Sequence, residues 1–153
     1  MSFSGSSVHT ISENGRVSIP SKIRDVLRRN YSDESIVLTV SRPLALDKAF
    51  LLAYPAQEWE KLEKSWLNPQ NRKEAFIARQ TSANSEDVSI DKQGRILISQ
   101  SLRAKAGLIG ECVIVGRINR IEIWDKDRWD IERTEFSNDS EEELGPQFGE
   151  LTY

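Results

Sequence analysis

The 153-residue sequence contains one cysteine and one histidine, and this scarcity excludes several kinds of site. The lone Cys112 cannot form a disulfide within the chain, and its place in the apolar run ECVIVG predicts an inert thiol in a buried strand. The lone His9 excludes a histidine cluster for a metal ion, and no spacing of Cys and His fits zinc. We therefore expect neither a metal site nor a cofactor.

Motifs of catalytic sites are missing as well. The sequence has no glycine-rich phosphate loop, and nothing near His9 suggests the relay that a nucleophilic Ser or Cys requires. The carboxylates are scattered; Glu60 and Glu63, for example, lie on one exposed face of a predicted helix. We predict that the protein is not an enzyme and has no catalytic residues, since an enzyme would need a site that no motif marks.

Long apolar runs are also absent. No stretch approaches the roughly 20 apolar residues of a membrane span. The first ten residues, MSFSGSSVHT, lack the basic and apolar regions of a signal peptide. We expect a cytoplasmic protein that binds neither a membrane nor a small-molecule ligand.

What the sequence does contain is one segment twice. NGRVSIPSKIRDVL (14–27) and QGRILISQSLRAKA (93–106) each hold a Gly-Arg pair, an alternating apolar run and a second arginine eight positions after the first. Further on, SIVLTV parallels ECVIVG, and FLLAYPAQEW parallels IEIWDKDRW. Each repeat is predicted to form a strand, a tight turn, a strand, a short helix and two more strands, with first strands at 7–12 and 88–91.

The size of one repeat predicts how the two are arranged. About 45 residues with four short strands can hardly bury a core of their own, so the repeats should share one as a pseudo-dimer. We predict a mainly β fold with short helices, in the α+β class. The segment between the repeats should be helical, with Trp59, Leu62 and Trp66 on one apolar stripe and a second helix at about 71–80. That stripe is expected to pack against the body of the protein, with contact to a neighbouring subunit as the alternative.

The turns and helix ends carry local signals. Asn14-Gly15 is a strong hairpin signal because both residue types tolerate positive φ, whereas Gln93 before Gly94 predicts a turn of another type. Pro20 is suited to open the first helix, and Gly107 to end the second.

The net charge of −3 hides an uneven distribution. Residues 131–153 contain seven acidic residues and one basic residue, so residues 1–130 carry a net charge of +3. Between 14 and 29 five cations face one acid, and between 92 and 105 four cations face none. Clusters at matching positions of the two repeats favour binding to a polyanion.

These segments resemble the GR-x-x-x-P-x-x-x-R pattern of AbrB-like (SpoVT-AbrB) swapped-hairpin DNA-binding domains. With the helical linker and the closing IEIWDKDRW, residues 5–130 resemble the MraZ family of bacterial transcriptional regulators. The resemblance implies two tandem half-barrels at 6–57 and 85–128, joined by linker helices at about 56–82. The tail at 135–153 lies outside the resemblance, and its acidic composition, poor in apolar residues, predicts that it is mobile. The resemblance further implies a homo-oligomeric ring that binds short direct repeats in double-stranded promoter DNA of the division and cell-wall gene cluster, as a nucleoid-associated repressor.

The resemblance also points to individual residues. The family's turn reads Asp-x-x-Gly-Arg; Asp91 keeps its Asp, whereas Ser12 replaces it and should brace the first turn more weakly. The family's proline is Pro20, whereas Ser99 stands in the second copy and is suited to cap its helix.

DNA contacts are expected first from Arg16 and Arg95, because each directly follows a turn glycine between two strands. The remaining candidates, as phosphate or structural partners, are Lys22, Arg24, Lys92 and Arg103. For the helical Arg24 and Arg103, bracing of their own repeat is the alternative. For the whole protein, the alternative is an antitoxin-like or scaffold protein of the same fold that holds a protein partner.

Overall fold

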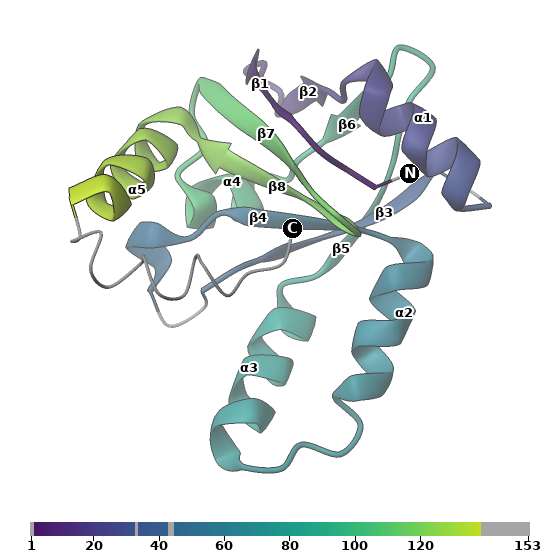
Figure 1. Ribbon diagram of the computed structural model, residues 1–153, viewed down its shortest axis with the longest axis vertical. Coiled ribbons are helices and arrows are strands. Elements are labelled where there is room, and N and C mark those ends of the chain that lie inside the picture. The colour runs from purple at the N-terminus through teal and green to yellow at the C-terminus, as the bar shows by residue number, and fades with distance from the viewer. Residues whose placement is uncertain (1, 33, 43–44, 139–153) are drawn as a thin grey trace.

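The fold is given by a computed structural model, in which residues 2–32, 34–42 and 45–138 are described (Figure 1). That part of the chain contains eight strands, five α-helices and one short 3-10 helix. In chain order they are β1 (Ser6–Thr10), β2 (Arg16–Ser18), α1 (Ser21–Asn30), β3 (Ser35–Val40), η1 (Leu46–Lys48), β4 (Leu51–Pro55), α2 (Ala56–Ser65), α3 (Arg72–Ala83), β5 (Glu86–Ser89), β6 (Arg95–Leu97), α4 (Gln100–Ala106), β7 (Glu111–Arg117), β8 (Arg120–Asp125) and α5 (Lys126–Asn138). The predicted class, mainly β with short helices, is confirmed.

The two repeats exchange their first strands. Six strands form one antiparallel sheet in the order β1-β7-β8-β4-β3-β5, so β1 of the first repeat pairs with β7 of the second, and β5 of the second pairs with β3 of the first. Strands β4 and β8 join the halves in the middle. Strands β2 and β6, one from each repeat, form a separate two-stranded ribbon. The predicted pseudo-dimer is therefore confirmed, with the repeats interlocked (Figure 1).

The expected hairpin of β1 and β2 does not form as a paired ladder. The turn itself closes, with the Ser12 N–H donating to the Arg16 carbonyl at 2.9 Å, but β1 then joins the sheet and β2 joins the ribbon. The expected difference between the two turns is also wrong. In both turns only the glycine takes a positive φ, Gly15 at 90° and Gly94 at 79°, so Gln93 is as well suited as Asn14.

One hydrophobic core lies between the sheet, the ribbon and the helices α1 and α4. It receives Val17 and Ile96 from the ribbon and the buried Cys112 from β7, as predicted for that thiol. Burial raises the pKa of Cys112 to about 11, which keeps the thiol protonated and unreactive at neutral pH. Because both repeats contribute to this cluster, they share one main core.

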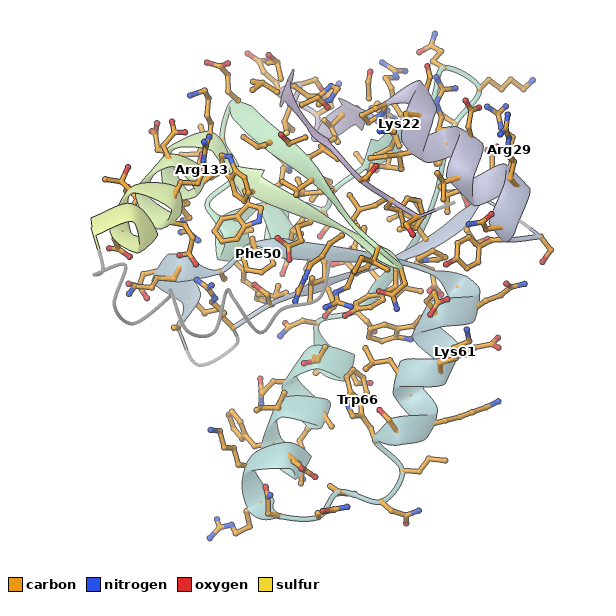
Figure 2. All side chains as sticks on the ribbon, in the orientation of Figure 1. Lys22, Arg29, Phe50, Lys61, Trp66 and Arg133 are labelled. Atoms are coloured by element: carbon orange, nitrogen blue, oxygen red, sulfur yellow. The ribbon has the colours of Figure 1, made fainter. Side chains whose placement is uncertain are left out.

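Helices α2 and α3 form a hairpin that extends away from the sheet (Figures 1 and 2). Trp59 is buried against Val37 and Tyr54 on the outer sheet face, with Leu62 and Trp66 packed alongside, which confirms the predicted packing of the stripe. Helix α3 begins after Asn71, whose side chain accepts a hydrogen bond from the Glu74 N–H at 2.8 Å. It ends three residues later than expected.

Helix α5 follows β8 and covers the outer sheet face near Trp124. The indole of Trp129 packs edge-on against Trp124, whose ring stacks on Phe50 at a centroid distance of 4.1 Å. The sequence patterns did not indicate this helix, which continues through Asn138. The remainder of the predicted mobile tail, 139–153, lies outside the described residues.

None of the helices in the described part of the chain combines the length and apolar composition that crossing a membrane requires.

The tip of the β7–β8 hairpin is strained at Ile118, where φ is 65° and the side chain is 72% exposed. Its backbone is fixed by Phe3, which exchanges two hydrogen bonds with it at 2.8 and 2.9 Å. A left-handed backbone costs a residue such as Ile about 1–2 kcal/mol, whereas Asn tolerates it. Ile118→Asn should therefore raise the free energy of unfolding in urea by about 1 kcal/mol.

Ile109→Asn is the matched control, since Ile109 is 90% exposed and has a negative φ. It should change stability by less than about 0.5 kcal/mol. Equal effects of the two substitutions would show that the backbone at Ile118 stores no strain.

Candidate nucleic-acid interface

The β2–β6 ribbon brings the two Gly-Arg arginines onto one surface. In its antiparallel register Arg16 lies opposite Leu97, Val17 opposite Ile96, and Ser18 opposite Arg95. Val17 and Ile96 point into the core and are each 1% exposed. Side chains alternate between the faces of a strand, so the other four residues share the outer face of the ribbon. We call this surface the ribbon face: Arg16, Ser18, Arg95 and Leu97.

The two arginines occupy diagonal corners of the ribbon face. They are two residues apart along the ribbon, which corresponds to roughly 7 Å. Local reasoning placed each arginine beside its own turn, but only the pairing of β2 with β6 brings them together. The ribbon lies at the opposite end of the molecule from the α2–α3 hairpin (Figure 1).

The turns before the arginines are braced to different degrees. The Asp91 carboxylate oxygen Oδ1 accepts hydrogen bonds from the Gln93 N–H at 2.8 Å and from the Arg95 N–H at 2.9 Å. In the first turn, Ser12 Oγ accepts one, from the Arg16 N–H at 3.0 Å. The expectation of a weaker brace at Ser12 is confirmed.

The Asp91 carboxylate also changes the electrostatic surroundings of Arg95. Oδ2 of Asp91 lies 3.4 Å from Nε of Arg95, so this arginine is paired with a carboxylate. Arg16 has no carboxylate within ion-pair distance among the described residues, because serine replaces the aspartate. The two corners of the ribbon face therefore carry the same side chain in different electrostatic surroundings.

Lowering the pH should destabilise the second turn, which a carboxylate braces, and not the first turn, which a serine braces. The hydrogen bond from the Arg95 N–H, joined by that from Gln93, holds the pKa of Asp91 below its ordinary value. A carboxyl with a lowered folded-state pKa stabilises the fold above its unfolded pKa of about 3.9, and this contribution is lost as pH falls through the folded-state pKa. Asp91→Ser should therefore lower the thermal midpoint at pH 7, and the difference from wild type should shrink towards pH 3.

Ser12→Asp is the reciprocal variant and should show the opposite sign, with a higher thermal midpoint than wild type at pH 7 and a gain that shrinks towards pH 3. A pH-independent difference between wild type and either variant would show that the ionised carboxylate is not what braces the turn.

Arg24 and Arg103 contact the turn glycines of the opposite repeats. Each arginine is first fixed within its own repeat: Nε of Arg24 donates to the Ile19 carbonyl at 3.2 Å, and Nε of Arg103 donates to the Ile98 carbonyl at 3.0 Å. A Cβ atom at Gly94 would lie 2.9 Å from Cζ of Arg24, and one at Gly15 would lie 2.8 Å from Nε of Arg103. Each helical arginine thus packs across the turn glycine of the other repeat.

The two candidate lysines are exposed. Lys22 lies in the first turn of α1, at the ribbon end of the molecule (Figure 2), and Lys92 lies in the second turn itself. All six candidate cations therefore lie on the ribbon, in its second turn, or on the helices α1 and α4 that follow its strands. The helix after Arg95 begins as expected, with Ser99 Oγ accepting from the Leu102 N–H at 3.2 Å.

Two residues of the ribbon face were missed by the sequence reasoning. Ser18 is exposed and Leu97 is 49% exposed, although each follows a candidate arginine by two positions in an alternating strand. That spacing is the signal that identifies them, because residues i and i+2 of a strand share a face.

Known proteins with similar sequences place this chain in a family. Residues 82–145 match the family model described as "MraZ protein, putative antitoxin-like". A transcriptional regulator MraZ of Desulforapulum autotrophicum is 39% identical over 93% of this chain and 90% of its own. Proteins of the same name from Pediococcus pentosaceus and Neisseria meningitidis are 40% and 33% identical, over 96% and 97% of this chain and 99% and 96% of theirs. The chain therefore belongs to the MraZ family.

Proposed function

We propose that this protein is a DNA-binding transcriptional regulator whose β2–β6 ribbon enters the major groove of promoter DNA. The observation that supports this proposal is the ribbon face, where Arg16 and Arg95 stand on a rigid frame backed by the buried pair of Val17 and Ile96. The major groove, about 12 Å wide, admits a two-stranded ribbon, and arginine is the side chain that most often reads guanine there. The relatives named above carry the name transcriptional regulator.

Lys22 and Lys92 act as phosphate contacts in this proposal. Both are exposed cations beside the ribbon, and phosphate contacts fix the position of a protein on a duplex without reading its sequence. Arg24 and Arg103 act as positioning residues, because they hold the turns from which the ribbon arises. Repeats 6–57 and 85–128 form one DNA-binding unit, since the ribbon takes one strand from each.

The proposal extends to the finer features that the family resemblance implies. Copies of the chain assemble into a ring, and the ring binds short direct repeats in the promoter of the division and cell-wall gene cluster and represses it within the nucleoid. One ribbon offers only two arginines, so tight binding requires several ribbons on successive DNA repeats, where avidity multiplies modest affinities.

A protein-binding role is the second candidate function. The α2–α3 hairpin exposes Leu67 (75%), which follows the C-terminal end of α2, and Phe76 (39%) in α3. An antitoxin-like or scaffold protein would hold its partner with such a surface. The double variant Leu67→Ser, Phe76→Ser tests this role. If it loses a protein complex while each copy still binds DNA as wild type does, the hairpin is favoured as a protein contact.

The experiment that tests the main proposal measures binding to DNA from upstream of the protein's own gene. We expect this duplex to bind more tightly than a scrambled duplex of equal composition, with log K falling linearly against log salt by about 0.9 for each phosphate contact. Lys73→Ala, which removes an exposed cation on α3 at the other end of the molecule, should change neither value. Equal affinity for both duplexes would contradict a sequence-reading function.

A further inference from the structure

The ribbon face is nearly symmetric between the two repeats, and it departs from symmetry at one pair of positions. Rotation about the centre of the ribbon exchanges Arg16 with Arg95 and exchanges Val17 with Ile96, a pair of similar apolar residues. The same rotation exchanges Ser18 with Leu97, a small polar residue with a large apolar one. Each end of the ribbon therefore carries one arginine, but with a different companion.

The register assigns each companion to its arginine. Leu97 lies directly across from Arg16, and Ser18 lies directly across from Arg95. Side chains at directly opposed positions have Cβ atoms about 4.5–5.5 Å apart, so each companion touches the surface that its arginine touches. The Leu97 end also lacks the carboxylate that pairs with Arg95 at the Ser18 end.

The exposure of Leu97 has no structural purpose that the described residues reveal. Its side chain is 49% exposed and belongs to none of the three hydrophobic clusters, whereas its neighbours Ile96 and Ile98 are buried in the core. An apolar side chain on a surface of arginines and serine is suited to an apolar feature of the partner. In the major groove the apolar feature is the C5-methyl group of thymine.

We propose that Leu97 and Ser18 give the ribbon a direction on DNA. This inference rests on the proposed function. Leu97 packs on a thymine methyl beside the guanine that Arg16 contacts, whereas Ser18 places a hydroxyl at the equivalent position beside Arg95. A ribbon with identical ends would bind a palindromic element equally well in both orientations. This ribbon binds an asymmetric element in one orientation.

The direction explains why the sites of such a protein would be direct rather than inverted repeats. Copies arranged head to tail present their ribbons with the same polarity. Directional ribbons can engage successive DNA elements together only when those elements point the same way. The Ser18–Leu97 difference therefore links the symmetry of the protein assembly to the arrangement of its DNA sites.

Selection from a pool of duplexes with a randomised centre tests the inference, with the full chain as bait. Wild type should enrich an asymmetric element that has a thymine beside only one of two guanine positions. Ser18→Leu makes both ends alike and should enrich a palindromic element with thymine on both sides. Leu97→Ser should enrich an element without the thymine preference, and the double variant should restore asymmetry.

Uracil in place of the selected thymine isolates the methyl group. We expect binding by wild type to weaken about fourfold, the effect of losing one buried methyl-sized contact, and binding by Leu97→Ser to be unchanged. Both positions are exposed outside the core, and circular dichroism should show wild-type folding for each variant.

The outcomes separate this inference from the function on which it rests. If wild type enriches no sequence from the pool, the proposed function is overturned, and the inference with it. If wild type enriches a motif that Ser18→Leu and Leu97→Ser leave unchanged, the directional role alone is overturned. Equal weakening by uracil in wild type and Leu97→Ser would also overturn it.

Discussion

Replacing Arg16 and Arg95 together with alanine should abolish sequence-specific DNA binding while the protein stays folded. Each bidentate contact between arginine and guanine contributes about 1–3 kcal/mol of discrimination, so losing two should weaken specific binding roughly 30-fold to 25,000-fold. Binding to scrambled DNA should fall much less, because it depends on phosphate contacts from the remaining cations. Competition between specific and scrambled duplexes measures the two effects together.

The fold should tolerate this change, since neither arginine belongs to the core. The ribbon is held from behind by Val17 and Ile96, which remain. Removing Arg95 breaks its pair with Asp91, but both side chains are more than a third exposed, and such surface pairs contribute about 0–1 kcal/mol. Thermal unfolding should therefore show a midpoint close to that of wild type.

Lysine at these positions separates charge from geometry. Arg16→Lys and Arg95→Lys keep the positive charge but lose the planar fork that contacts two guanine acceptors. We expect each to retain most of the salt dependence and to lose much of the preference for the specific duplex. If the double alanine variant instead binds with wild-type affinity and salt slope, the ribbon face is not the DNA-binding surface.

The features that could be predicted from the sequence depend on neighbours along the chain. The weaker brace at Ser12, the serine cap at Ser99 and the apolar stripe that begins at Trp59 were all expected from local patterns, and the structure has them. The shared core was expected as well, because one repeat is too small to bury its own apolar residues.

The features of the candidate site that were missed depend on contacts between the repeats. No spacing in the sequence shows that β2 pairs with β6 instead of β1, and the ribbon face exists only because of that pairing. The roles of Arg24 and Arg103 also depend on contacts between the repeats, and the sequence left both a phosphate contact and a structural role open for them. Their positions across Gly94 and Gly15 depend on the exchange of strands. The candidate residues were thus recognisable one by one, whereas their assembly into a surface was not.

Both turn glycines should be sensitive to substitution, and Gly15 more so than Gly94. At Gly15 (φ 90°) a Cβ atom would lie 2.5 Å from the Ile98 backbone carbonyl oxygen, which cannot move without distorting the other repeat. At Gly94 (φ 79°) the nearest atoms belong to the flexible end of the Arg24 side chain. Backbone strain of about 1–2 kcal/mol applies to both, and an overpacking cost of about 1–3 kcal/mol is added at Gly15.

Gly15→Ala should therefore lower the free energy of unfolding in urea by about 2–5 kcal/mol, and Gly94→Ala by about 1–2 kcal/mol. Gly110→Ala is the control, because a Cβ there would meet no atom within 4 Å, and its effect should stay within about 0.5 kcal/mol. Gly15 and Ile98 belong to different repeats, so the loss should appear as one cooperative transition at lower urea. A separate early transition of residues 6–57 would instead mean that the repeats fold independently, which the shared core and exchanged strands argue against.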